Sequence, residues 1–124
     1  MCARSNHAWK AICLSVISFE ENGEVWGASS RLIYSMILFF LEDAGPKPYL
    51  LNFRRMYDDG YNVLFLEKIS LEQLIEFRRL VEKFARVAPY QQVFAGEMAH
   101  ESIRANLVKL LEMTDASIAR RRPS

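Results

Sequence analysis

Apolar positions recur along this chain with two different periods, and the clearer period predicts a helix over residues 70–87. Ser70 and Gln73 have the spacing of a capping box at its start, and Pro89 ends it. The expected inward-facing residues recur every three or four positions. They are Leu71, Leu74, Ile75, Phe77, Leu80, Val81, Phe84 and Ala88.

Two further segments have helical patterns. Ser29 or Ser30 can cap a helix that runs to about residue 43, where Gly45 and Pro46 would end it. Its apolar run, residues 32–41, is about half of the roughly 20 residues that a bilayer requires, so we expect a buried helix and no membrane partner. A last helix is predicted from about residue 97 to 116. Its expected inward positions are Ile103, Leu107, Leu110 and Leu111.

The N-terminal third of the chain has the pattern of a β-hairpin. Residues 9–19 are β-branched and apolar without clean alternation, as in a strand covered on both faces. Asn22-Gly23 suits a type I′ turn, since both central positions of that turn need positive φ. This turn would place Phe19 opposite Trp26.

Residues 49–57 fit both periods. Leu50, Phe53 and Tyr57 share one face of a helix. The strand face would instead carry Leu51, Phe53, Arg55 and Tyr57. The following Asp-Asp-Gly, residues 58–60, suits a three-residue hairpin loop, and residues 63–68 read as a strand. We therefore predict a second hairpin, while the helical alternative for residues 49–57 stays open.

These elements predict an α+β domain in the order ββαββαα. Its mainly antiparallel sheet would have about four strands in two hairpins, with three helices on one face. At 124 residues the chain is expected to form a single domain, 1–124, with flexible segments at residues 1–8 and 117–124.

Composition excludes some classes of function. A content of 51% hydrophobic and 25% charged residues is typical of a globular protein and not of a disordered one. The net charge of +1 provides no overall field for nucleic acid, and we do not expect nucleic acid as a partner. Two cysteines without a framework spacing favour a reducing, cytoplasmic location.

No motif in the sequence points to catalysis or to a cofactor. The single Glu97-x-x-His100 lacks the second motif that a di-iron bundle needs, and Cys2, His7 and Cys13 match no zinc spacing. We therefore expect no metal, no cofactor and no catalytic residue. The alternative is a small enzyme or ligand-binding domain that uses carboxylates in a pocket. Those candidates are Glu20, Glu24, Asp58, Asp59 and Glu67.

One surface has the composition of a protein interface. Tyrosine and arginine are enriched in binding hot spots. Acidic residues beside them add electrostatic interactions that mainly set the specificity and the association rate. The residues predicted to bind a partner at the second hairpin tip are Arg54, Arg55, Tyr57, Asp58, Asp59 and Tyr61. Arg78 is a further candidate because it falls on the apolar side of its helix. The structural alternative is that Arg55 pairs with Asp58 or Glu67 and that Tyr57 covers the edge of the core.

The function that fits these features is a small protein-binding module. It would be an inhibitor or an immunity or antitoxin protein of bacterial type that covers the active site of another protein, such as a toxin domain. It would act as a monomer or homodimer. A self-assembling subunit that pairs through an apolar edge strand is a third hypothesis.

Overall fold

The computed structural model describes residues 14–19, 24–61, 63–87 and 100–122. The described part has the predicted α+β class, with four α-helices and a mixed three-stranded sheet. In chain order the elements are β1 (Leu14–Ser18), β2 (Val25–Ser29), α1 (Ser30–Ala44), α2 (Pro48–Asp58), β3 (Val63–Phe65), the 3-10 turn η1 (Leu66–Lys68), α3 (Leu71–Val87) and α5 (His100–Arg121).

The sheet has the order β2-β1-β3, with β1 antiparallel to β2 and parallel to β3. The predicted four-stranded, mainly antiparallel sheet is therefore wrong. The predicted strand over residues 63–68 is extended only as Val63–Phe65, and it pairs with β1 rather than with a hairpin neighbour.

The register of the first hairpin also differs from the prediction. Trp26 pairs with Ile17 and not with Phe19, a shift of two residues. Because side chains alternate with a period of two, the shift leaves the same residues facing the core, and Phe19 and Trp26 are both buried. The Asn22-Gly23 turn lies outside the described residues.

Residues 49–57 belong to helix α2 and not to a strand. Pro48 occupies the first turn, where a missing N–H costs nothing, and Leu50 and Phe53 face the core. The Asp-Asp-Gly of residues 58–60 ends this helix as a Schellman motif. Gly60 has φ +94°, its N–H donates to the Tyr57 carbonyl, and the Tyr61 N–H donates to the Met56 carbonyl. The same three residues that indicate a hairpin loop in the sequence are thus a helix terminus.

The predicted positions of the other three helices are confirmed, with shifts of a few residues at the ends. Ser29 caps α1 by accepting from the Leu32 N–H at 3.2 Å, and Gly45 ends it with φ +91°. The Ser70–Gln73 capping box is present, with reciprocal hydrogen bonds of 2.9 and 3.1 Å. Ile75 is 40% exposed, so its predicted inward position is wrong.

Helix α5 continues to Arg121, five residues beyond the predicted end at residue 116. Arg121 donates to the carbonyls of Leu66 and Ile69, both at 2.7 Å, so it holds the end of α5 against the connection between η1 and α3. The predicted flexibility of residues 117–124 stays a prediction, although the helix covers most of that segment.

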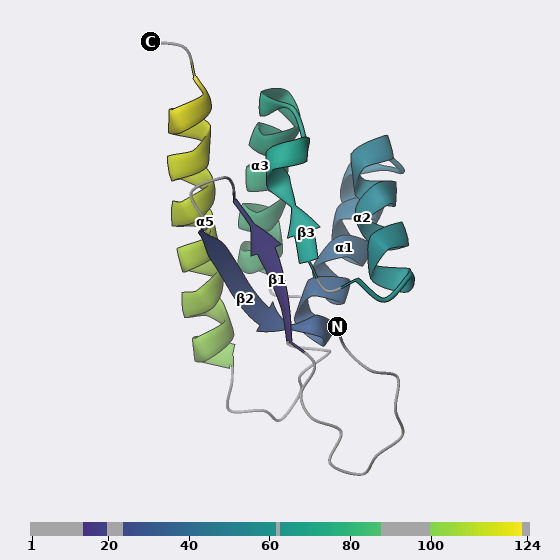
Figure 1. Cartoon of the computed structure of the whole chain (residues 1–124). Coiled ribbons are helices and arrows are strands. Elements are labelled where there is room, and N and C mark those ends of the chain that lie inside the picture. Colours follow the sequence, from purple (N-terminus) through teal and green to yellow (C-terminus); the bar gives the residue numbers. More distant parts are fainter. Residues whose placement is uncertain (1–13, 20–23, 62, 88–99, 123–124) are drawn as a thin grey trace.

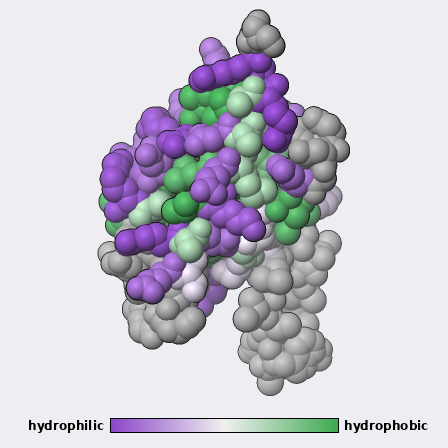
Figure 2. All heavy atoms as spheres, turned by 90° about the vertical axis from the view of Figure 1, so that its left-hand side faces the viewer, coloured by the Kyte–Doolittle hydropathy of each residue, from purple (hydrophilic) through white to green (hydrophobic). Residues whose placement is uncertain are grey.

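The helices α1, α3 and α5 lie on one side of the sheet, behind it in Figure 1. Helix α5 is fastened to β2 by the Trp26 indole N–H, which donates to the Asn106 carbonyl at 2.8 Å. The Asn106 side-chain amide donates in turn to the Gly27 carbonyl at 3.0 Å. The side of the molecule formed by α5 is mixed, with hydrophilic residues separating smaller hydrophobic areas (Figure 2).

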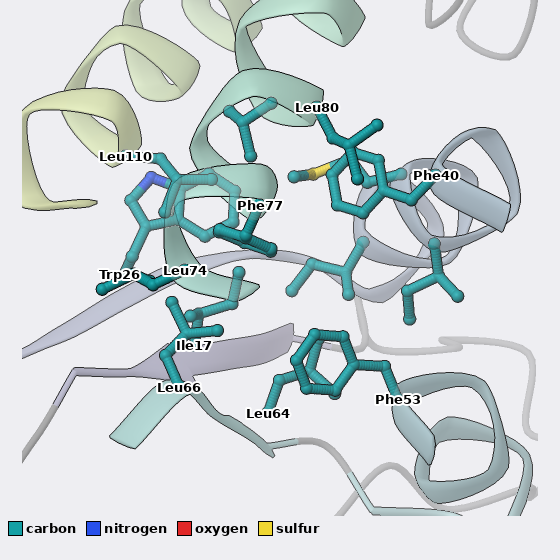
Figure 3. Close-up of a cluster of buried hydrophobic side chains, with 14 of the residues drawn as sticks. Ile17, Trp26, Phe40, Phe53, Leu64, Leu66, Leu74, Phe77, Leu80 and Leu110 are labelled. Atoms are coloured by element: carbon teal, nitrogen blue, oxygen red, sulfur yellow. The ribbon is translucent and has the colours of Figure 1, made fainter. Parts of the chain in front are cut away.

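The hydrophobic core fills the space between sheet and helices. Ile17, Leu64 and Leu66 face Phe77 and its neighbours across this layer (Figure 3). Aromatic edges join the helices, since the Phe77 ring lies 5.6 Å from that of Phe40 and 6.4 Å from that of Phe53. Phe77 therefore connects α3 with both α1 and α2.

Candidate functional site: the α1–α2 surface

The outward sides of α1 and α2 form the candidate site. On α1, Arg31, Tyr34 and Leu38 follow at spacings of three and four residues and so share one side of the helix. On α2, Leu51, Arg54 and Asp58 do the same. The two rows and the residues between them are called the α1–α2 surface below. Its members are Arg31, Tyr34, Leu38, Leu51, Arg54, Tyr57 and Asp58.

A stacked pair of tyrosines joins the two rows. The rings of Tyr34 and Tyr57 lie 4.7 Å apart with an interplanar angle of 21°. Tyr57 follows Arg54 by three residues, so the stack places the α1 row beside the α2 row. The Tyr57 hydroxyl donates to the Ser30 carbonyl at 3.2 Å. Burial, together with the neighbouring Tyr34, raises the pKa of the Tyr57 phenol, which therefore stays protonated and keeps this hydrogen bond at neutral pH.

The rows present both apolar and charged groups to solvent. Leu38 is 39% exposed and Leu51 is 45% exposed, which is high for large aliphatic residues on helices that otherwise bury such side chains. Arg54 lies 3.6 Å from Asp58, and both side chains are about half exposed. An exposed pair of this kind contributes little to stability, because solvent screens it. Its charges remain accessible to a partner.

The remaining residues predicted near Tyr57 lie at the end of α2 rather than at a hairpin tip. Arg55 is exposed and donates to Asn52 at 2.6 Å, so the predicted pairing with Asp58 or Glu67 is not the contact that it makes there. Asp59 occupies the C-cap position, and Tyr61, 57% exposed, follows the Schellman turn. The prediction that Tyr57 covers the edge of the core is confirmed, since it packs against the hydrophobic cluster.

Arg78 does not lie on this surface. It sits on α3 and donates to Asp115 of α5 at 2.9 Å and to Glu82 at 2.8 Å. The hydrogen bond that Arg78 donates to Asp115 raises the pKa of the guanidinium above its ordinary value, so this side chain stays charged. Arg78 therefore links α3 to α5 within the chain.

A second polar cluster lies where the α1–α2 connection meets α3. Glu76 accepts hydrogen bonds from Lys47 and from the Tyr49 hydroxyl, both at 2.7 Å, and Arg79 lies 3.7 Å away. Asp43 at the end of α1 pairs with Lys83 at 2.5 Å. These contacts fasten α1 and the start of α2 to α3.

The titration of this cluster does not suit proton transfer at neutral pH. Burial alone would raise the pKa of Glu76, but the hydrogen bonds from Lys47 and Tyr49 hold it below its ordinary value. Burial and the adjacent Glu76 raise the pKa of Tyr49. A general base or acid works best with a pKa near the working pH, and both shifts lead away from neutrality. We therefore interpret the cluster as a structural connection.

The described carboxylates of the enzymatic alternative fall into two groups, Asp58 with Asp59 before β3 and Glu24 with Glu67 at its other end. Asp59 precedes β3, whereas Glu67 follows it, so they lie at opposite ends of that strand. Glu24 lies at the Glu67 end, because the neighbouring Val25 pairs with the last residue of β1. Glu24 contacts Arg120 at 3.8 Å, and Glu67 accepts from Ser18 at 3.4 Å. Glu20 lies outside the described residues.

Other chemistry tested in the sequence finds no site in the part of the chain that the structure describes. No group of three or more His, Cys, Asp or Glu side chains could hold a metal ion there. Cys2, His7, Cys13 and Glu97 fall outside the described residues. Among the helices described, none combines the length and the apolar character needed to cross a membrane.

Sequence reasoning missed the α1 half of the surface. Residues 32–41 are apolar nearly all round, which hides the side that faces solvent. The one indication in the sequence was Tyr34-Ser35, because these are the only residues in that run whose side chains carry a hydroxyl group. Leu51 was missed because the predicted partner-binding residues were limited to residues 54–61 around the expected hairpin tip.

Comparison with known proteins adds no relative. The chain matches no protein-family model, no curated protein and no solved structure. Any functional conclusion therefore depends on the geometry of the residues described above.

Proposed function

We propose that this chain is a small non-catalytic protein-binding module that works by covering the active site of a partner protein. Inhibitors and immunity or antitoxin proteins act in this way, and the partner would be a protein such as a bacterial toxin domain. The proposal includes a cytoplasmic location. The observation that carries it is the α1–α2 surface, where Leu38, Leu51, Arg54 and Asp58 are exposed beside a fixed pair of tyrosines.

The physical properties of this surface favour binding over mere solvation. Hot spots combine apolar anchors with arginine and tyrosine, since these side chains bury large areas at low entropic cost. The stack of Tyr34 on Tyr57 and the hydrogen bond to Ser30 hold the centre rigid. A rigid surface loses less conformational entropy on association. Charges of both signs at Arg54 and Asp58 would set the orientation of the partner.

The test uses a double variant, Leu38→Lys with Leu51→Lys, because both side chains are exposed and their replacement leaves the core intact. The immobilised wild-type chain should retain a protein from an extract of its native host, and that purified protein should lose its own activity when the chain is added. The double variant should retain at least tenfold less, which corresponds to about 1.4 kcal/mol.

The matched control is Val108→Lys on α5, which is 46% exposed on another side of the molecule. It should retain the partner as the wild type does, and the thermal midpoints of all variants should agree within a few degrees. Equal retention by the double variant, or a retained protein whose activity is unaffected, would refute the proposal. Tyr57 is a poor choice for this test because it also packs against the core.

A further inference from the structure

Among the described strands, β2 and β3 form the two edges of the sheet, and helix α5 lies beside β2 (Figure 1). An edge strand presents unpaired N–H and C=O groups to which a strand of another chain can add. Proteins protect such edges with charged residues, proline, bulges or very short strands, or by covering the edge with another element. The two edges can therefore be compared by the protection that each one has.

The sequence of β2 contains none of the protective features. Its five residues, Val25–Ser29, include no charged residue and no proline. Each of them pairs with one residue of β1 in continuous register, so no bulge interrupts the ladder. The other edge strand, β3, has only three residues, and a short edge is protected by its length. Protection of the β2 edge has to come from another part of the chain.

The hydrogen-bond pattern of the first hairpin shows which groups form the β2 edge. The Phe19 N–H donates to the Glu24 carbonyl at 2.9 Å, which makes these two residues a hydrogen-bonded pair. Hydrogen-bonded and non-hydrogen-bonded pairs alternate along an antiparallel ladder. Val25 and Gly27 are therefore in non-hydrogen-bonded pairs, and their backbone groups point away from β1. An added strand would pair with these groups.

Asn106 of α5 occupies one of the edge groups. Its side-chain amide donates to the Gly27 carbonyl at 3.0 Å, as the N–H of an added strand would. The Asn106 backbone carbonyl accepts from the Trp26 indole N–H at 2.8 Å, which fixes this turn of the helix beside the strand. Trp26 is only 1% exposed, so its ring cannot move without opening the core. The Asn106 amide is thus held at the β2 edge.

A second contact holds α5 near the start of β2. Arg120 lies 3.8 Å from Glu24, the residue directly before the strand. Both side chains are more than 40% exposed, so this pair contributes little to stability. Of the two contacts, the one between Asn106 and Gly27 is the one that occupies a backbone group of the edge.

We propose that α5 protects the β2 edge, and that the Asn106 amide, by taking the place of an added strand at Gly27, prevents β2 from pairing with β2 of a second copy. Self-assembly through the β2 edge is then blocked in the intact chain and becomes possible when the Asn106 contact is broken. Two antiparallel β2 strands would satisfy each other about a twofold axis, so the product of unprotected edges is a dimer. This proposal does not depend on the function of the α1–α2 surface.

Sedimentation velocity on the full chain, from about 1 μM to about 1 mM, tests the protection. The wild type should keep the mass of one copy, 14.4 kDa, over this range. Asn106→Asp replaces the amide donor by a carboxylate that cannot donate to Gly27. Its mass should rise to about twice that of the wild type, and infrared spectroscopy in the amide I region should show additional strand pairing at the same concentrations.

Trp26→Phe tests the same contact from the strand. It removes the indole N–H that binds the Asn106 carbonyl but leaves an aromatic ring in the core, and it should also associate. Adding Val25→Lys to Asn106→Asp should restore the mass of one copy, because a charge on an edge strand opposes pairing. Val25 is 53% exposed, so the core does not limit this replacement.

The matched control loosens α5 at a different place. Arg78→Ala removes the guanidinium that donates to Asp115, where α5 faces α3, and it should keep the mass of one copy. Thermal midpoints are measured for all variants, because a merely stabilising contact would lower the midpoint of Asn106→Asp without changing its mass.

Three results would overturn the proposal. The first is an Asn106→Asp variant with the mass of the wild type. The second is association of that variant that Val25→Lys does not reverse, since the strands would then not pair at the β2 edge. The third is equal association of Arg78→Ala, because loosening α5 anywhere would then be sufficient.

Discussion

At the scale of single residues, Glu76 on α3 accepts hydrogen bonds from two residues at the start of α2. It accepts from Lys47 before α2 and from Tyr49 within α2, and both partners lie at 2.7 Å. Its side chain is 18% exposed, so solvent screens these contacts less than those of the surface pairs around it. This carboxylate and the ring contact between Phe53 and Phe77 both hold α2 against α3.

Replacing Glu76 by glutamine should lower stability near neutral pH by about 1–3 kcal/mol, because a charged acceptor of two hydrogen bonds is lost. The lowered pKa of Glu76 contributes stability that is complete above its ordinary value of 4.5 and is lost as the pH falls through the lowered value. Glu76→Gln should therefore lose less stability than the wild type on acidification below about pH 5.

Urea unfolding at several pH values measures both effects of the Glu76→Gln substitution. Glu72→Gln, exposed on the same helix, is the control, and an acid slope for Glu76→Gln equal to that of the wild type would contradict the assignment.

At the scale of elements, the two ends of each helix explain which predictions were right. The capping box at Ser70 and the glycine at the end of α1 are local signals, and both are present. The Asp-Asp-Gly after α2 is local too, but it serves a hairpin loop and a Schellman terminus equally well, since both need a glycine with positive φ. The hydrogen bond from the Tyr61 N–H to the Met56 carbonyl identifies it as the helix terminus.

The same substitution at two glycines should have opposite effects. Gly60→Ala places a Cβ on a residue with φ +94° and should cost about 1–2 kcal/mol. Gly27→Ala, in a strand with room for a Cβ, should be neutral or stabilise by up to about 1 kcal/mol. Urea denaturation followed by far-UV circular dichroism gives both free energies. Equal costs at the two positions would mean that the Schellman geometry of α2 is wrong.

At the scale of the whole molecule, one hydrophobic cluster includes residues of the sheet and of all four described α-helices. Phe77 occupies its centre, with ring contacts to Phe40 of α1 and Phe53 of α2 (Figure 3). Trp26 and Leu110 extend the cluster to β2 and α5. The α1–α2 surface and the three-stranded sheet are therefore held by the same packed interior.

Phe77→Ala should cost about 3–5 kcal/mol, a large part of the 5–15 kcal/mol that stabilises a typical domain. Because its ring joins three helices, the loss should appear as one earlier transition in both far-UV and near-UV circular dichroism. Ile75→Ala, on the same helix and 40% exposed, should change stability by about 0.5 kcal/mol or less. Separate transitions for the two signals in Phe77→Ala would show that the core does not act as a unit.

Signals within a few residues of one another were sufficient for α1, α3 and most of α5, since periodicity and capping depend on neighbours along the chain. They also grouped residues 54, 55, 57, 58, 59 and 61 as partner-binding candidates, although at a hairpin tip, whereas the structure places them in the last turns of α2 and just after it. Local signals could not predict the α1 row of Arg31, Tyr34 and Leu38. That row comes to lie beside the α2 residues only when α1 packs on α2.

Two features were decided only by the tertiary structure. Residues 49–57 have apolar spacings that fit a helix and a strand, and the burial of Leu50 and Phe53 in the core selects the helix. The partner of β3 is β1, with Val16 beside Val63, and no local signal marks a pairing across that many residues. Hydrophobic burial is nondirectional, so the sequence alone determines which side chains leave water, while the packing of the folded chain decides which of them meet.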